Sequence, residues 1–105
     1  MPGNVTGRYA LARLRESVPG GDTHECHQPP AVSGSVAIAE DSLEASVHFG
    51  DGSLDQTFGG SWRWEDPYIW VTTSDCGENP VLYLDGELTV IFEYGGLRYT
   101  AHYRR

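Results

Sequence analysis

The sequence contains no lysine, one methionine, two cysteines and no long apolar run. Seven basic residues, all of them arginines, stand against fifteen acidic ones, so the formal net charge is −8. Nucleic acids and anionic membrane surfaces attract basic proteins, so this charge argues against both as partners. No segment reaches the roughly 20 apolar residues that a transmembrane helix needs, so we expect no membrane insertion.

Other familiar signals are also missing. There is no secretory signal peptide, no phosphate-binding loop, no dinucleotide fingerprint and no Gly-x-Ser-x-Gly motif, so no cofactor is expected. The opening Met1-Pro2-Gly3-Asn4 looks like a start codon placed on a trimmed mature domain, which suggests an extracytoplasmic location. With 105 residues, 39% hydrophobic and 21% charged, residues 1–105 are expected to form one globular domain.

The two cysteines, Cys26 and Cys76, lie in two expected loops. In an oxidising compartment they predict one disulfide, which would close a chain segment of about fifty residues and contribute up to ~4 kcal/mol in the chain-entropy model. In the cytosol they would be free thiols.

The strongest structural signal lies between Val81 and Tyr103, where two glycine turns join three apolar-rich strands. Asp85-Gly86 and Gly95-Gly96 suit two-residue type I′ turns, whose central residues both need positive φ. Such turns fix the register of the flanking strands. The predicted cross-strand partners are Leu84 with Glu87, Tyr83 with Leu88, Tyr94 with Leu97, Phe92 with Tyr99, Val90 with Ala101, and Leu88 with Tyr103.

This register separates two kinds of side chain. The outer face pairs opposite charges or polar groups directly across the strands: Glu93 with Arg98, Glu87 with Arg104, and Thr89 with His102. The inner face is apolar and aromatic. It consists of Val81, Tyr83, Leu88, Val90, Phe92, Tyr94, Leu97, Tyr99, Ala101 and Tyr103.

The rest of the chain also favours short strands. Residues Val5–Leu14 fit either a strand, because Tyr9 and Leu11 alternate with other residues, or a helix, because Ala10–Glu16 has high helix propensity. A long loop is expected over Ser17–Pro30. After it come a hairpin over Val32–Phe49 with a turn at Glu40-Asp41-Ser42, a strand over Leu54–Phe58 that Gly59-Gly60 breaks or kinks, and strands over Ser61–Trp64 and Tyr68–Thr73.

These segments make about eight short strands joined mostly by tight turns. Meandering strands of this number remove their exposed edges by closing on themselves. The predicted fold is therefore all-β, a small eight-stranded antiparallel up-and-down barrel. Such a barrel is just wide enough to be filled by side chains or to hold one small ligand.

Gly7-Arg8-Tyr9 opens the chain's first apolar segment, and Tyr103-Arg104 ends its last. The first resembles the Gly-x-Trp opening of lipocalins, with Tyr for Trp. The second resembles the last-strand arginine that stacks on that aromatic ring from outside the barrel. Short motifs between them, at residues 34–38, 49–52, 60–62 and 86–90, are similar to those of short bacterial lipocalin-like domains. The chain is shorter than a full lipocalin and has no flanking helix, so the resemblance supports the fold more than ligand carriage.

Aromatic residues are the main candidates for a binding site. Clustered at a barrel mouth they would bind a small apolar or aromatic molecule, and otherwise they would fill the interior. The candidate ligand-binding residues are Tyr83, Phe92, Tyr94, Tyr99, Tyr103, Trp62 and Trp64. Tyr68 and Trp70 share another face, so they belong either to the core or to an exposed binding stripe.

The densest metal-ligand cluster is His24-Glu25-Cys26-His27. His24, Cys26 and His27 would suit zinc or copper if Cys76 or Glu78 completed the set. No paired CxxC or HxxxH spacing supports this, and a disulfide would consume both thiols, so a disulfide-anchored loop is the competing interpretation.

Three function classes follow from these patterns. The first is a non-catalytic module that binds a small apolar or aromatic molecule. The second is a structural or interaction domain with a filled core. The third is a small barrel enzyme of cyclase or isomerase type, which needs an inward acid or base. The C-terminal strands, whose register the two glycine turns fix, offer only tyrosine as an inward proton donor. The oligomeric state does not follow from the sequence.

Overall fold

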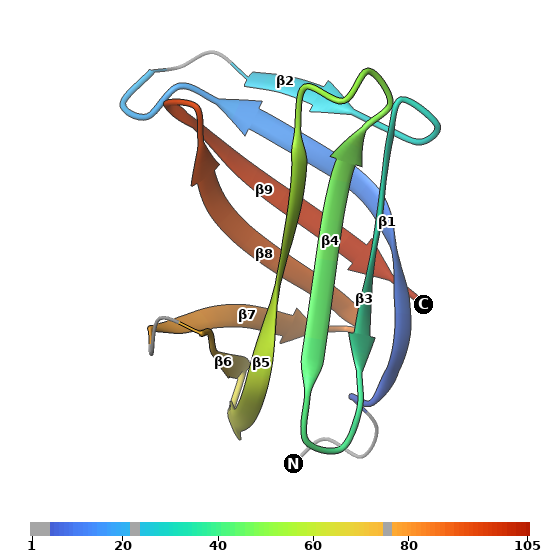
Figure 1. The fold of residues 1–105 in the computed structure, drawn as a ribbon, viewed down its shortest axis with the longest axis vertical. Coiled ribbons are helices and arrows are strands. Elements are labelled where there is room, and N and C mark those ends of the chain that lie inside the picture. Colours follow the sequence, from blue (N-terminus) through green and yellow to red (C-terminus); the bar gives the residue numbers. More distant parts are fainter. Residues whose placement is uncertain (1–4, 22–23, 75–76) are drawn as a thin grey trace.

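The computed structural model describes residues 5–21, 24–74 and 77–105, and this part of the chain is all-β (Figure 1). Among these residues no helix is long and apolar enough to cross a membrane. The strands are β1 (Gly7–Ser17), β2 (His24–His27), β3 (Val32–Ile38), β4 (Leu43–Phe49), β5 (Asp55–Glu65), β6 (Tyr68–Thr72), β7 (Glu78–Leu84), β8 (Glu87–Tyr94) and β9 (Leu97–Arg104).

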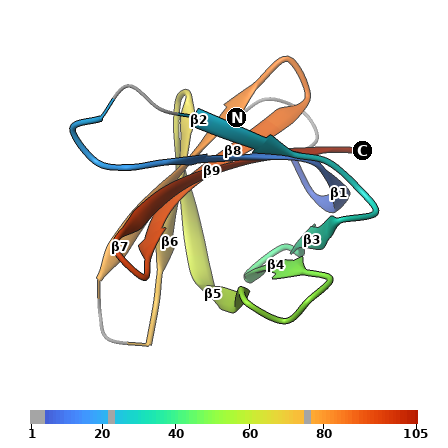
Figure 2. The same cartoon turned by 90° about the horizontal axis from the view of Figure 1, so that it is seen from above.

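Eight of these strands close into a small antiparallel barrel, which confirms the predicted fold class. Strands β3 to β8 each pair with the next in the chain, and β1 pairs with both β3 and β9. Seen from above, β3 and β4 lie on one side and β6 and β7 on the other, with β1 and β9 running between them (Figure 2). The closure leaves β1 and β9 without the long free edge of an open sheet.

The additional strand, β2, corrects the prediction of a loop over Ser17–Pro30. Residues His24–His27 pair with Leu14–Ser17 of β1, whereas Gly7–Ala10 of β1 pair with β3. Strands β2 and β3 therefore share one edge of β1, one above the other. The polar tetrapeptide His-Glu-Cys-His has no apolar alternation, so nothing local in the sequence marks it as a strand.

The first segment is a strand rather than a helix, and it contains an irregularity. The β1–β9 register shifts between Leu11 and Arg13. Such a bulge inserts one residue and changes which side chains face inward. It explains why Tyr9, Leu11 and Leu14 are all buried although they do not follow one alternating pattern.

Both predicted glycine turns are present, and every predicted cross-strand pair from Leu84–Glu87 to Glu93–Arg98 is observed. Asp85 and Gly86 have φ of 53° and 77°, and Gly95 and Gly96 have 62° and 81°. These positive values are what a type I′ turn requires. The turns therefore determine which side chains of β7, β8 and β9 enter the core.

Strand β5 is continuous, so Gly59-Gly60 does not break it into two strands. Instead β5 changes partner there: residues up to Gly60 pair with β4, and residues from Ser61 pair with β6. A side chain at Gly59 or Gly60 would collide with the carbonyl oxygen of Leu43 or of Thr72. The two glycines thus permit the backbone contact at which the strand passes from one neighbour to the other.

The core fills the barrel along its length. It contains no buried polar or charged residue within the described part of the chain. Its buried residues are Val5, Tyr9, Leu11, Leu14, Val32, Val36, Ile38, Leu43, Ala45, Val47, Leu54, Ile69, Val71, Val81, Leu88, Val90, Tyr99, Ala101 and Tyr103.

Candidate functional site

The barrel wall is incomplete on one side because a segment of β5 and a segment of β8 each have a partner strand on only one edge there. In β5, the residues before Ser61 pair with β4 alone. In β8, the residues after Val90 pair with β9 alone. These two half-paired segments face each other across the side of the barrel and leave a cleft between β5 and the β7–β8 pair.

This side cleft has a volume of about 190 Å³ and is mainly apolar. Its inner surface includes the buried valines Val47, Val81 and Val90, so it reaches the core. The full lining is Val47, Gln56, Thr57, Phe58, Asn79, Pro80, Val81, Val90, Ile91, Phe92 and Glu93. An apolar floor with a few polar groups at the rim is the usual composition of a small-molecule site.

Two amide side chains lie at this cleft. Gln56 is the cross-strand partner of the buried Val47, and Asn79 is that of the buried Val71. Partners in a ladder share one face of the sheet, so both amides are on the inner face. Gln56 is half-buried and donates a hydrogen bond to the carbonyl oxygen of Asp55, whereas Asn79 is exposed at the cleft mouth. They can offer both donors and acceptors to a ligand.

Only Phe92 of the seven predicted ligand-binding residues lines the cleft. Sequence reasoning missed Val47, Gln56, Phe58 and Asn79. The signal that could have found them is the Gly59-Gly60 pair, because a strand that changes partner leaves a gap on its unpaired side.

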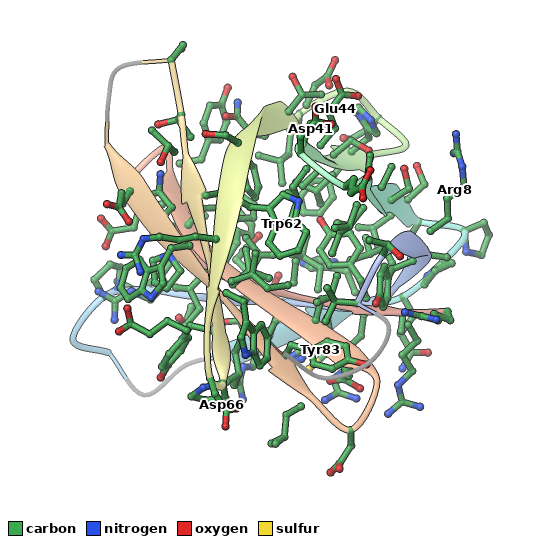
Figure 3. The ribbon with its side chains drawn as sticks, turned by 90° about the horizontal axis from the view of Figure 1, so that it is seen from below. Arg8, Asp41, Glu44, Trp62, Asp66 and Tyr83 are labelled. Atoms are coloured by element: carbon green, nitrogen blue, oxygen red, sulfur yellow. The ribbon has the colours of Figure 1, made fainter. Side chains whose placement is uncertain are left out.

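Three of the predicted aromatic residues fill the lower end of the barrel. Trp62 lies over its middle when seen from below, with Tyr83 also on the inner side, while Arg8 points away at the periphery (Figure 3). The indole of Trp62 donates a hydrogen bond to the carbonyl oxygen of Ala39 at 2.9 Å. Trp64 and Tyr83 pack edge to face, with ring centroids 6.1 Å apart. The three rings are partly buried and pack against the core.

The other three aromatic candidates lie further up the barrel or inside it. Tyr99 is buried and stacks on Phe92 at 5.2 Å between centroids. Tyr103 is also buried, and its hydroxyl donates a hydrogen bond to the carbonyl oxygen of Ser46 at 2.9 Å. Tyr94 is on the predicted face but 43% exposed, because it lies beside the β8–β9 turn beyond the packed core.

The expected arginine–aromatic contact is made by Arg105, not by Arg104. The Arg105 guanidinium lies 4.9 Å from the centre of the Tyr9 ring and donates hydrogen bonds to the Tyr9 hydroxyl at 2.8 Å and to the carbonyl oxygen of Thr6 at 3.1 Å. The Tyr9 hydroxyl itself donates to the carbonyl oxygen of Val5. Arg104 is on the outer face, bonded to Glu87 as the predicted register requires.

The predicted metal ligands are not brought together in the form expected. His27 lies beside Glu16 of β1 and Glu25 of β2. The exposed Cys26 stands between Glu25 and His27 in β2, so its side chain points to the opposite face of the strand. The side chain of His24 and the residue Cys76 lie outside the described part of the chain. The predicted disulfide between Cys26 and Cys76 therefore also lies outside it.

Tyr68 and Trp70 are on the outer face, because Ile69 and Val71 between and beside them are buried. Their rings are 6.0 Å apart, and the guanidinium of Arg63 lies 5.6 Å from the centre of the Trp70 ring. The pair thus lies on the outer surface and not in the core, with Trp70 half-buried and Tyr68 39% exposed.

The chain matches no protein-family model, and no curated protein or solved structure is significantly similar to it. The functional argument therefore rests on the geometry described above.

Proposed function

We propose that this protein is a non-catalytic binding module for a small apolar or aromatic molecule, held in the side cleft between β5 and the β7–β8 pair. The observation that carries the proposal is an apolar cleft that opens on the surface and reaches the buried Val47, Val81 and Val90. Core residues of a closed barrel are normally covered by the neighbouring strand, so a cleft that extends from the surface to core valines marks a site where another apolar group can pack.

The volume of the cleft limits the size of the ligand. An apolar cavity of about 150 Å³ is large enough for benzene, and this cleft has about 190 Å³. Pockets for drug-sized ligands are larger, at roughly 300–1,000 Å³. We therefore propose a ligand with one or two fused rings or a short alkyl chain, with its polar end at the amides of Gln56 and Asn79.

The proposal includes a lipocalin-like character for the barrel. It is supported by the up-and-down closure and by Arg105, which covers the Tyr9 ring at the end of the chain. Entry through the side is part of the same proposal, because the lower end is occupied by Trp62, Trp64 and Tyr83.

The experiment is a titration of the purified protein with indole, monitored by the shifts of its amide NMR signals. The native mass of the untreated protein is measured as well, to detect a ligand that is already bound. We expect shifts concentrated at the lining residues. Asn79→Trp should abolish them, because the exposed Asn79 at the mouth tolerates a larger side chain that would fill the cleft. Asn79→Ser is the matched control and should still bind. If indole shifts residues elsewhere, or if Asn79→Trp binds as well as the unmodified protein, the cleft is not the site.

A second candidate function is an interaction domain, and one observation favours it. Several apolar side chains are exposed on the outer faces of β6, β7 and β8: Tyr68 (39%), Leu84 (59%) and Ile91 (62%). An outer face of this kind would suit association with a second copy of the chain. Light scattering over a range of protein concentrations separates the two functions. Only the interaction domain predicts a molecular mass that rises with protein concentration and falls after Ile91→Ser.

A further inference from the structure

We propose that Glu16, Glu25 and His27 form a binding site for a divalent transition-metal ion, with Zn²⁺ as the best match. These residues lie on β1 and β2 near the upper end of the barrel. One ligand atom from each, two carboxylate oxygens and an imidazole nitrogen, lies within 4.8 Å of the other two. The site is separate from the side cleft, with which it shares no residue.

The strand register places the two carboxylates together. Glu16 and Glu25 are directly opposite each other in the β1–β2 ladder. Like charges in this position destabilise a sheet. The ion pairs of both carboxylates within the described residues are with His27, at 3.6 Å for Glu16 and 3.9 Å for Glu25. An arginine would be the ordinary neutralising partner, so the arrangement leaves a need for positive charge that a bound cation would satisfy.

The imidazole of His27 gives an independent indication. Its Nε2 atom is shielded from solvent and makes no hydrogen bond within the described residues, where Nε1 of Trp70 is the other buried side-chain atom of this kind. A buried polar atom without a partner is costly and often marks an ion or water site. The ring packs against Phe49 with centroids 4.9 Å apart, which holds Nε2 in its position toward the carboxylates.

The distances from Nε2 of His27 to the two carboxylates fit ligands of a shared metal ion better than they fit direct hydrogen bonds. Separations of 3.6 and 3.9 Å are too long for hydrogen bonds from Nε2. Ligands bound about 2.0–2.2 Å from a tetrahedral zinc ion lie roughly 3.3–3.6 Å from one another. The three ligand atoms lie up to 4.8 Å apart, and the side chain of Glu25 is 67% exposed, so it can move toward the other two when an ion binds.

The donor set favours zinc over the common alternatives. Ca²⁺ and Mg²⁺ prefer six or more oxygen ligands, whereas one imidazole with two carboxylates suits zinc and leaves a fourth position for water. Glu16 is also close to the Tyr99 hydroxyl. This hydroxyl can orient the Glu16 carboxylate toward a bound ion.

The test is calorimetric titration of the chelator-treated full chain with zinc chloride at pH 8. We expect one ion per chain. Glu16→Gln and His27→Ala should each weaken binding by about tenfold or more. The matched control is His48→Ala, because within residues 5–21, 24–74 and 77–105 His48 pairs with a single carboxylate, that of Asp55 on the surface at 2.6 Å. This variant should bind zinc unchanged.

A second readout separates loss of the site from loss of the fold. Without zinc, Glu16→Gln should have the same or a higher melting temperature, because it removes the repulsion from Glu25. With excess zinc, only the unmodified protein and His48→Ala should gain stability. The proposal is overturned if the unmodified chain takes up no zinc. It is also overturned if Cys26→Ser abolishes binding while Glu16→Gln keeps it, because the ion would then be held by the thiol.

Discussion

Among single residues, Glu87 makes the densest set of charged contacts on the outer face. Its carboxylate accepts a hydrogen bond from Arg104 at 2.7 Å and lies 2.9 Å from Nδ1 of His102 and 3.7 Å from Arg13. The hydrogen bond from Arg104 is the main cause that lowers the pKa of Glu87, with smaller contributions from the charges of Arg104, His102 and Arg13. Burial and the charge of Arg13 lower the pKa of His102.

This arrangement predicts a pH-dependent stability. A carboxyl group with a lowered pKa in the folded protein stabilises it at pH values above its ordinary pKa of about 4.5, and this stabilisation is lost as the pH falls through the lowered value. Glu87→Gln should therefore reduce the free energy of unfolding by about 1 kcal/mol at pH 7. The difference from the unmodified protein should shrink in acid, as measured by urea denaturation from pH 7 to pH 2.

The control for Glu87 is Glu93→Gln. Glu93 contacts one arginine, Arg98, at 3.2 Å, and its side chain is 61% exposed. Exposed pairs of this kind contribute little, so the free energy of unfolding should change by less than about 0.5 kcal/mol. Equal effects of the two substitutions at pH 7 would show that the contacts of Glu87 carry no special stabilisation.

At the scale of the elements, the hairpin turns determine the inside and the outside of three strands. Gly86 has a φ of 77° in the β7–β8 turn, which a side chain makes unfavourable. Gly86→Ala should lower the free energy of unfolding by about 1–2 kcal/mol, measured with urea. Gly50→Ala is the control, because Gly50 does not have a positive φ and an added Cβ would be an ordinary 3.5 Å from the carbonyl oxygen of Ala31. A loss as large in Gly50→Ala would contradict the role assigned to the turn.

These turns also explain what could be predicted from the sequence. Positive φ at Asp85-Gly86 and Gly95-Gly96 is a local requirement, and once the turn length is known the partners and faces of β7, β8 and β9 follow. The aromatic residues were correctly placed on the inner face there. Whether they line a cavity or fill it depends on how the whole barrel packs, which no single strand encodes.

The missed elements depend on contacts between distant segments. Strand β2 forms because Leu14–Ser17 of β1 offer it an edge, not because His24–His27 prefer extended structure. The inward position of Glu16 depends on the register shift near Leu11. Likewise, the cleft exists only because β5 changes its partner from β4 to β6 after Gly60. The sequence shows a glycine at that position, but it does not show which strands pair there.

At the scale of the whole molecule, one side of the barrel is closed by strand pairing and the opposite side contains the cleft. The pairing of β1 with β9 completes the barrel, and residues from the first and last strands meet again where Arg105 contacts Tyr9. On the opposite side, the first half of β5 and the last half of β8 each have one ladder partner instead of two. A segment with fewer cross-strand hydrogen bonds opens at a lower free-energy cost.

Amide hydrogen exchange should therefore divide the barrel unevenly. We expect slow exchange in β1, β9 and the paired part of β3, and exchange at least about tenfold faster in residues 55–60 and 91–94, since each 1.4 kcal/mol of opening free energy changes the rate by that factor. A ligand that packs in the cleft covers these same segments, so indole should slow their exchange and leave β1 largely unchanged. Uniform protection around the barrel would mean that the wall is not weakened at the cleft. If these segments exchange faster but indole does not slow their exchange, then the barrel wall is weaker at the cleft but the cleft is not where indole binds.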